Sequence, residues 1–263
     1  MLLVIDIGNT NTSLGVFDRD RLVTHWRLTT ARSRTVDEWG VHARNLFALA
    51  GLDFKTIDAI AIASVVPPVN FTLKRMAETY FHLSPLFVDH AIDTGVPILY
   101  QPASDVGADR IVDAAAAIHK YGAPCIVVDF GTATTFDAIN SKGEYLGGVI
   151  TPGITISADA LFERAAKLPR VEIKRPQSVV GSSTVGAMQS GLYHGYVGLV
   201  DGILRRMIDE LGGAPRVIAT GGLAPLIATG SEFIEEVDET LTLEGLRLVY
   251  ERNASLKSRE SAV

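Results

Sequence analysis

The chain contains a single cysteine, Cys125, so no disulfide can form within it. Cys125 lies in an apolar run, residues 125–128, and is interpreted as a small core residue rather than a catalytic thiol. Basic residues are in deficit, because 24 Lys and Arg face 30 Asp and Glu and give a formal net charge of −6. Such a chain lacks the positive field that gathers nucleic-acid phosphates or anionic lipid. Neither nucleic acid nor a membrane is therefore expected as a partner.

The sequence also has no apolar run that approaches the length of a membrane span. Its first residues lack a basic leader, and the opening apolar stretch meets an acid at Asp6, so no signal peptide is expected. With 263 residues, 47% of them hydrophobic, the chain can bury one large core or two smaller ones. Together with the single cysteine, these features predict a cytoplasmic protein.

Several common catalytic motifs are absent. No glycine–lysine dipeptide occurs and no two glycines are spaced two apart, which excludes a Walker A loop and a dinucleotide fingerprint. The Gly-x-Ser-x-Gly elbow of hydrolases is missing as well. None of the six histidines pairs with another at metal-ligand spacing, so zinc chemistry is not supported.

One pattern is present twice. Residues 3–10 run Leu-Val-Ile-Asp-Ile-Gly-Asn-Thr, and residues 126–133 run Ile-Val-Val-Asp-Phe-Gly-Thr-Ala, with 123 residues between equivalent positions. The likeness extends into a second strand, where residues 14–17 match residues 137–140. Each half is therefore predicted to open with a β-hairpin whose first turn carries an aspartate and a glycine.

The repeated Asp-x-Gly turn suits phosphate binding. Its glycine lets the backbone approach a phosphate, and the side chains that follow it supply hydrogen-bond donors: Asn9, Thr10, Thr12, Thr132, Thr134 and Thr135. The two carboxylates, Asp6 and Asp129, are placed to hold a hard cation, directly or through water. An ordinary tight turn explains any single copy equally well. Duplication at equivalent positions favours two loops that face one triphosphate.

The remaining pattern alternates strands with helices and predicts an α/β protein. A capping box at residues 35–38 begins a helix that ends at Gly51, strands are predicted at 57–63 and 86–88, and a helix at 108–121. The second half is predicted to contain helices near 155–167, 184–211 and 243–251 and a strand at 216–219. We expect a first domain at residues 1–117, a second at 118–255 and a disordered tail at 256–263.

A third acidic motif, Gly107-Ala108-Asp109-Arg110, lies at the start of a predicted helix. Asp109 there suits the positive end of the helix dipole, but Asp113 follows four residues later and the like charges disfavour the helix slightly. Arg110 suits a bidentate bond to a substrate carboxylate, and a structural salt bridge fits the local pattern equally well. The glycine-rich stretches 147–153 and 219–222 permit close backbone approach, and 181–184 is typical of a helix N-cap.

Taken together, residues 6–10, 107–110, 129–132 and 147–153 resemble the signature series of type III pantothenate kinases, in order and spacing, over nearly the whole chain. That family belongs to the superfamily of acetate and sugar kinases, Hsp70 and actin. The resemblance implies two duplicated ribonuclease H-like, actin-type ATPase domains with mixed sheets flanked by helices. It also implies ATP, Mg²⁺ and a monovalent cation, K⁺ or NH₄⁺, and a homodimer formed through the second domain.

The resemblance further implies a role for each matched residue. Asp109 is the catalytic base, and Asp129 holds the monovalent cation. From the chemistry of the first turn, Asp6 is expected to reach magnesium through water. The implied ATP-binding residues are Asp6, Ile7, Gly8, Asn9, Thr10, Asn11, Thr12, Ser13 and Thr132. The implied pantothenate-binding residues are Tyr100, Gly107, Ala108, Asp109, Arg110 and Thr184.

The expected reaction is the ATP-dependent phosphorylation of pantothenate to 4′-phosphopantothenate, the first step towards coenzyme A. Three alternatives stay open on the sequence. The chain could phosphorylate another small hydroxy acid or sugar, it could be a regulatory binding protein that has retained the fold, or it could release phosphate without an alcohol acceptor.

Overall fold

The computed structural model describes the chain through residue 260, with side chains described through residue 256, and it divides into two units. Unit 1 comprises Met1–Ala116 together with the segment from Leu241 onward, and unit 2 comprises Ala117–Thr240. The sequence places the first boundary one residue later. It also extends the second domain to residue 255. The structure corrects this second boundary, because the last helix packs on the first sheet.

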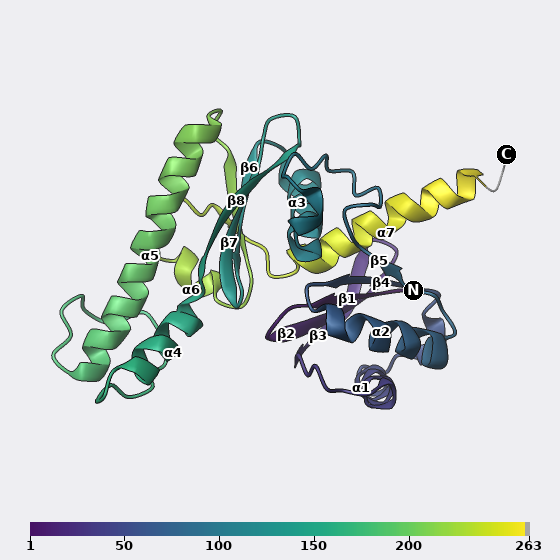
Figure 1. The fold of residues 1–263 in the computed structure, drawn as a ribbon, viewed down its shortest axis with the longest axis horizontal. Helices are drawn as coiled ribbons and strands as arrows, with labels where there is room; N and C mark the ends of the chain where they lie inside the picture. The colour runs from purple at the N-terminus through teal and green to yellow at the C-terminus, as the bar shows by residue number, and fades with distance from the viewer. Residues whose placement is uncertain (261–263) are drawn as a thin grey trace. The chain divides into compact units, whose positions relative to one another are not determined.

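The sheet of unit 1 has five strands in the order β3-β2-β1-β4-β5 (Figure 1). Their bounds are β1 Leu2–Ile7, β2 Asn11–Asp18, β3 Arg21–Thr29, β4 Ala59–Ser64 and β5 Leu86–Phe87. Strand β1 pairs antiparallel with β2 and parallel with β4, so the sheet is mixed. All the side chains of β1 except Asp6 are buried, which explains its nearly continuous apolar sequence.

The sheet of unit 2 repeats this arrangement in the order β10-β9-β6-β7-β8. Its strands are β6 Cys125–Phe130, β7 Ala133–Ile139, β8 Tyr145–Pro152, β9 Arg216–Thr220 and β10 Glu236–Val237. Central β6 pairs antiparallel with β7 and parallel with β9, as β1 does with β2 and β4. Two five-stranded mixed sheets of equal topology confirm the predicted duplication and the actin-like ATPase fold.

The strand register corrects one detail of the repeat. Ile5 pairs with Leu14 in the first hairpin, and its equivalent Val128 pairs with Phe136 in the second. The second turn is thus one residue shorter, and Leu14 corresponds to Phe136 rather than to Asp137. Both of these side chains are buried, so the apolar contact is what the two copies share.

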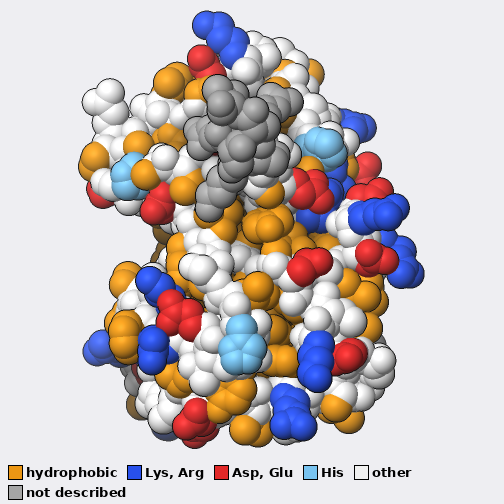
Figure 2. Space-filling view, turned by 90° about the vertical axis from the view of Figure 1, so that its right-hand side faces the viewer, with side chains coloured by type: hydrophobic (Ala, Val, Ile, Leu, Met, Phe, Trp, Pro, Cys, Tyr) orange, Lys and Arg blue, Asp and Glu red, His pale blue; other side chains and the backbone are white. Residues whose placement is uncertain are grey.

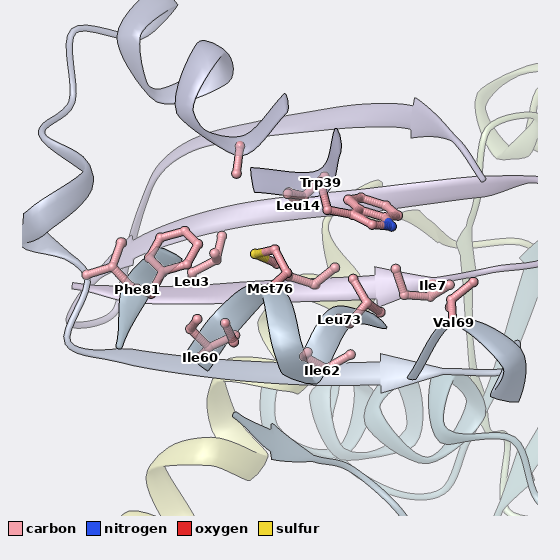
Figure 3. Close-up of a cluster of buried hydrophobic side chains, with 14 of the residues drawn as sticks. Leu3, Ile7, Leu14, Trp39, Ile60, Ile62, Val69, Leu73, Met76 and Phe81 are labelled. Carbon is pink, nitrogen blue, oxygen red and sulfur yellow. The ribbon is translucent and has the colours of Figure 1, made fainter. Parts of the chain in front are cut away.

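Two helices of unit 1 pack on its sheet and complete one core. These helices are α1 Val36–Leu49 and α2 Pro67–Met76, the latter continued by a π-helical turn at Ala77–Phe81. Thr35 and Glu38 form the predicted capping box at the start of α1. Figure 3 shows Leu73 and Met76 of α2 beside Ile60 and Ile62 of β4. This core fixes β1 and β4 and hence the turn that follows β1.

Helix α7, Leu241–Glu260, packs against β1, β2 and β4 and therefore belongs to unit 1. The sequence predicts this helix only at residues 243–251 and a disordered tail from 256. The structure instead continues the helix through Glu260, and residues 261–263 of the predicted tail lie outside the described residues. Helix α3, Ala108–Tyr121, contains the boundary between the units.

Unit 2 has its own core, formed between the sheet and α5, Thr184–Leu211 (Figure 1). Val200 and Leu204 of α5 are fully buried in this core with Ile126 and Val128 of β6. The shorter helices are α4 Ile154–Arg164 and α6 Ala224–Ala228. The predicted helices near 155–167 and 184–211 are confirmed, with α4 ending earlier than expected.

Cys125 is fully buried in β6, as the sequence predicts, and burial raises the pKa of its thiol to about 12. On the face displayed in Figure 2, acidic and basic side chains are interspersed. Within the portion of the chain that the structure describes, no helix has both the length and the apolarity needed to cross a membrane.

Candidate active site

The first repeated turn joins β1 to β2, and contacts at its base hold it in place. Gly8 N donates to Asn11 O at 2.9 Å, which closes the turn, and the Thr30 hydroxyl donates to Gly8 O at 2.7 Å. Thr12 is fully buried and shares a 2.9 Å hydrogen bond with Thr30. Asn9 and Thr10 at the tip are exposed. The turn therefore presents its tip to a ligand, whereas Thr12 holds its base.

Thr30 and Arg32 were not predicted as site residues, although Arg32 Nη2 also reaches this turn and donates to Asn9 Oδ1 at 3.1 Å. Nothing in the sequence signals either contact, because both residues follow β3 and are distant from the turn along the chain. Strand pairing alone brings them together.

The box at 107–110 lies beside the same end of this sheet. Val65 follows β4, and its N donates to Ile7 O, the last residue of β1, at 3.1 Å. A Cβ built on Gly107 would come within 3.2 Å of Val65 Cγ1 and within 2.4 Å of Asp109 Oδ1. Asp109 Oδ1 also accepts from Arg110 N at 2.8 Å. The fold thus places Asp109 near the carboxyl ends of β1 and β4, where the first turn also begins.

Tyr100, Ala108 and Arg110 are further predicted site residues of this unit. Tyr100 is half-buried in the connection between β5 and the short 3₁₀ turn at Ala103–Asp105, and Arg110 is half-buried in the first turn of α3. Ala108, the first residue of α3, is buried. Ala108 therefore contributes packing, and its neighbours carry the polar groups.

The second repeated turn joins β6 to β7 in unit 2, and two glycines from other segments pack against it. Gly153 N donates to Thr132 O at 3.2 Å, and a Cβ on Gly153 would lie 2.3 Å from that oxygen. A Cβ on Gly221 would lie 2.5 Å from Asp129 Oδ1 and 2.7 Å from Phe130 O, and Gly221 has φ +90°. Only glycine fits at either position. The stretches 147–153 and 219–222 are therefore used for close approach to this turn.

The space around Asp129 suits a cation. One carboxylate oxygen faces Gly221 and the other lies 3.3 Å from the Cβ position of Gly131, so both oxygens border space that a larger side chain would fill. Hard cations take oxygen ligands, and a carboxylate beside backbone carbonyls provides them. The donor set therefore fits an alkali cation.

The described residues do not supply a magnesium site made of protein side chains alone. Among the residues that the structure describes, no group of three or more His, Cys, Asp or Glu is placed to hold a metal ion. Mg²⁺ usually keeps several waters and binds through one or two carboxylates plus substrate phosphates. Asp6, the half-buried polar residue of β1, fits such a water-mediated contact.

Thr184 is the first residue of α5 in unit 2 and is exposed. The Ser183 hydroxyl caps the helix by accepting from Gly186 N at 3.1 Å, as the sequence predicts for 181–184. Gly181 packs against the backbone of residues 186 and 187. Of the predicted residues, Asp129, Thr132 and Thr184 lie in unit 2 and the others lie in unit 1.

Comparison with known proteins identifies the relatives of this chain. The profile of the type III pantothenate kinase family matches residues 2–206. The chain is 59% identical over 265 residues to a type III pantothenate kinase of Koribacter versatilis, with 97% of each chain covered.

Among solved structures, the chain resembles a protein of Campylobacter jejuni described as a Baf family transcriptional activator, with TM-score 0.59, 20% identity and coverage of 96% of this chain and 99% of the other. It also resembles the activator of 2-hydroxyisocaproyl-CoA dehydratase from Clostridium difficile, with TM-score 0.54, 12% identity and coverage of 100% and 97%. These two likenesses concern the fold. The sequence matches assign the family. The chain belongs to the type III pantothenate kinases.

Proposed function

We propose that this protein transfers the γ-phosphoryl group of ATP to the primary alcohol of pantothenate and forms 4′-phosphopantothenate and ADP. The observation that carries the proposal is the position of Asp109 near the end of β1, where the first Asp-x-Gly turn begins, in a chain of this family. The reaction is the entry into coenzyme A synthesis, and we place it in the cytoplasm.

Asp109 acts as the base for the pantothenate hydroxyl. Phosphoryl transfer passes through a loose transition state, so positioning and charge neutralisation contribute more than base strength. A carboxylate, although a much weaker base than an alkoxide, can accept the proton late, as the new P–O bond forms. The bond from Arg110 N and the adjacent Gly107 orient the carboxylate for this step.

The two turns bind the triphosphate. The exposed tip of the first turn, with Asn9 and Thr10, supplies backbone and side-chain donors, and Thr132 in the second turn supplies another. The wider ATP-binding set includes Asp6, Ile7, Gly8, Asn11, Thr12 and Ser13. Thr12 is buried and Ile7 belongs to the core, so both act by holding the turn.

Two cations assist. Asp129 holds K⁺ or NH₄⁺, and Asp6 contacts Mg²⁺ through water. Bound cations of this kind neutralise charge that develops on the phosphate oxygens. The glycines beside Asp129 support this assignment because a larger side chain at Gly221 would fill the space next to the Asp129 carboxylate.

Tyr100, Gly107, Arg110 and Thr184 bind pantothenate. Arg110 pairs with the pantothenate carboxylate by a charge-assisted bidentate bond, which explains a guanidinium next to the catalytic carboxylate. Gly107 leaves room for the Asp109 side chain.

The protein acts as a homodimer joined through unit 2. Exposed apolar side chains gather on edge strand β8 and on α4: Leu146, Val149, Ile150, Ile156 and Leu161. An exposed apolar group of this kind marks an interface with another protein. Strand β8 is also the edge of its sheet, where an uncovered strand favours association.

The decisive experiment is ADP formation from ATP, measured with and without pantothenate and with and without K⁺. ADP that appears only when pantothenate and K⁺ are both present supports the proposal, and mass spectrometry of 4′-phosphopantothenate completes the assignment. Phosphate release without an alcohol would instead indicate a phosphatase. ATP binding without transfer to pantothenate or to a panel of sugars and hydroxy acids would indicate a regulatory protein.

A further inference from the structure

Unit 2 contains a buried carboxylate that no role described above uses. Asp137 in β7 is fully buried, and two hydroxyl groups donate to it. Tyr145 Oη donates to Asp137 Oδ1 at 2.6 Å, and Thr135 Oγ1 donates to Asp137 Oδ2 at 3.2 Å. Tyr145 is also fully buried. A buried carboxylate is costly unless it is well bonded, so this arrangement needs a reason.

The first hairpin shows that the fold itself does not need this carboxylate. With the second turn one residue shorter, the position of Asp137 corresponds to Gly15. A Cβ on Gly15 would lie 3.1–3.3 Å from side-chain carbons of Val4, Leu22 and Leu243, so the first copy fills this position with apolar packing. The first hairpin therefore forms without a polar group at this position. The role of Asp137 is specific to unit 2.

Asp137 lies on the same face of the sheet as Asp129. Thr135 pairs directly with Asp129 across the β6–β7 ladder, and Asp137 pairs with Val127. Side chains of directly paired residues point to one face and their Cβ atoms are about 4.5–5.5 Å apart. Thr135 and Asp137 are two residues apart on β7 and hence also share that face. Thr135 therefore lies between the two carboxylates.

The hydrogen bond gives the Thr135 hydroxyl a defined direction. A hydroxyl has one proton and two lone pairs, and an ionised carboxylate only accepts. Because Thr135 donates its proton to Asp137, the lone pairs of its hydroxyl can accept or coordinate on the side toward Asp129, with which Thr135 pairs across the ladder. Tyr145 in turn fixes the Asp137 carboxylate, and Gly148, which pairs with Asp137 from β8, adds no side chain there.

We propose that Thr135 Oγ1 is a second side-chain ligand of the monovalent cation at Asp129, and that Asp137 and Tyr145 are positioning residues that orient this ligand. The inference rests on the cation assignment made under the proposed function. Outer partners that hydrogen-bond a metal ligand typically contribute about 10–100-fold to metal affinity. The relevant property is thus the affinity and selectivity of the site for K⁺, separate from the transfer step.

The test measures cation binding without turnover. The midpoint of thermal unfolding is recorded in a KCl titration against tetramethylammonium chloride at constant ionic strength, with Mg²⁺ and a non-hydrolysable ATP analogue present. A ligand that binds the native state raises the midpoint according to its affinity. The matched pair is Thr135→Val, which removes the hydroxyl at equal size, and Thr135→Ser, which retains it.

For Thr135→Val and for Asp137→Asn, we expect the K⁺ concentration for half of the shift to rise about tenfold or more, and for Tyr145→Phe a smaller rise. Thr135→Ser should stay near the wild-type value. Circular dichroism and the midpoint without K⁺ establish that each variant folds. If Asp137→Asn does not fold, the Thr135 pair and Tyr145→Phe still decide the question.

The Asp129→Ala variant distinguishes a failure of the Thr135 inference from a failure of the proposed cation site. If Asp129→Ala abolishes the K⁺ shift while Thr135→Val keeps the wild-type response, Thr135 is no ligand and this inference is overturned, with the proposed cation site intact. If Asp129→Ala itself keeps the wild-type K⁺ shift, the cation assignment of the proposed function fails first.

Discussion

In each unit, one glycine limits where a candidate carboxylate can lie. A Cβ on Gly107 would lie 2.4 Å from Asp109 Oδ1, and a Cβ on Gly221 would lie 2.5 Å from Asp129 Oδ1. In both cases the carboxylate oxygen occupies or borders the space that a side chain at the glycine position would fill. Each glycine is therefore expected to influence the proposed chemistry through the aspartate beside it.

The first prediction concerns Gly107→Ala. The added methyl group displaces the Asp109 side chain and not the backbone, so the fold should persist while turnover falls, by about 10²-fold if the carboxylate moves by about 1 Å. Steady-state kinetics and a thermal melt give the two readouts. Gly191→Ala is the matched control, because a Cβ there meets nothing within 4 Å. Equal turnover of the two variants would contradict the assigned role of Gly107.

The second prediction concerns Asp109→Asn. An amide of the same shape cannot accept the hydroxyl proton, so kcat should fall by about 10²–10⁴-fold. ATP-analogue affinity, measured by calorimetry, should change little, because Asp109 is assigned to the alcohol and not to the triphosphate. Wild-type turnover in this variant would exclude Asp109 as the base.

At the scale of elements, a charged cluster joins the end of α3 to the loop between β10 and α7 within unit 2. The Lys120 ammonium and the Tyr121 hydroxyl both donate to Asp238 Oδ2, the latter at 2.9 Å. Thr240 N and Oγ1 each donate to Asp238 Oδ1 at 3.1 Å. The chain passes from one unit to the other at Ala116–Ala117 and at Thr240–Leu241, so the cluster fixes the residues next to both passages.

The pKa values of this cluster follow from its bonds. Burial alone would raise the pKa of Asp238, but the hydrogen bond and charge of Lys120, with the bonds from Tyr121 and Thr240, outweigh burial and lower it. Burial, with the Asp238 hydrogen bond, raises the pKa of Tyr121 to about 12. A carboxylate with a lowered folded-state pKa stabilises the fold above its unfolded-state pKa and ceases to do so as the pH falls through the folded value.

The third prediction is therefore a pH-dependent effect of Asp238→Asn. At pH 7 the variant should lose about 1–3 kcal/mol in the free energy of unfolding, because charge-assisted hydrogen bonds to Lys120 and Tyr121 are lost or weakened. The difference from wild type should shrink below about pH 4, where the unfolded-state carboxyl is protonated and the folded-state one becomes so. Urea unfolding at pH 7 and pH 3 measures it. A difference that does not depend on pH would contradict the ionic account.

At the scale of the whole molecule, the exposed apolar side chains of β8 and α4 determine the expected assembly. Ile150 is 63% exposed in the edge strand, and Leu146 and Val149 are exposed near it in the sequence. Exposed leucines occur in unit 1 as well, as at Leu49, which is 84% exposed at the end of α1. A strand edge with several apolar groups differs from a single exposed leucine, which needs no explanation.

The fourth prediction follows from this contrast. Ile150→Asp should convert a dimer into monomers at micromolar concentration, because it places an unpaired charge in the proposed interface. Light scattering after size-exclusion chromatography measures the mass. Leu49→Asp, the control with an equivalent change in unit 1, should keep the dimer mass. Dissociation by both substitutions, or by neither, would refute a dimer joined through β8.

The duplicated turn and the long helices were predictable from local apolar patterning and from a repeat visible in the sequence, and the mixed sheets followed from the family resemblance. Other features depended on pairings between distant segments. Thr30 reaches Gly8 only because β3 pairs with β2, and the one-residue difference between the two turns appears only in the strand register. Helix α7 was predicted too short, since few apolar residues follow residue 251.

The sequence by itself determined the family and the α/β class, and it singled out the acidic and glycine residues proposed for the site, because these depend on residue type and order. Only the tertiary structure decided which groups meet: Val65 beside Gly107, Gly221 against Asp129, and Thr135 between Asp129 and Asp137. The physical reason is that these contacts join residues far apart in the chain or across a strand register. A shift of one residue, which reverses the face of every side chain in a strand, leaves no trace in composition or periodicity.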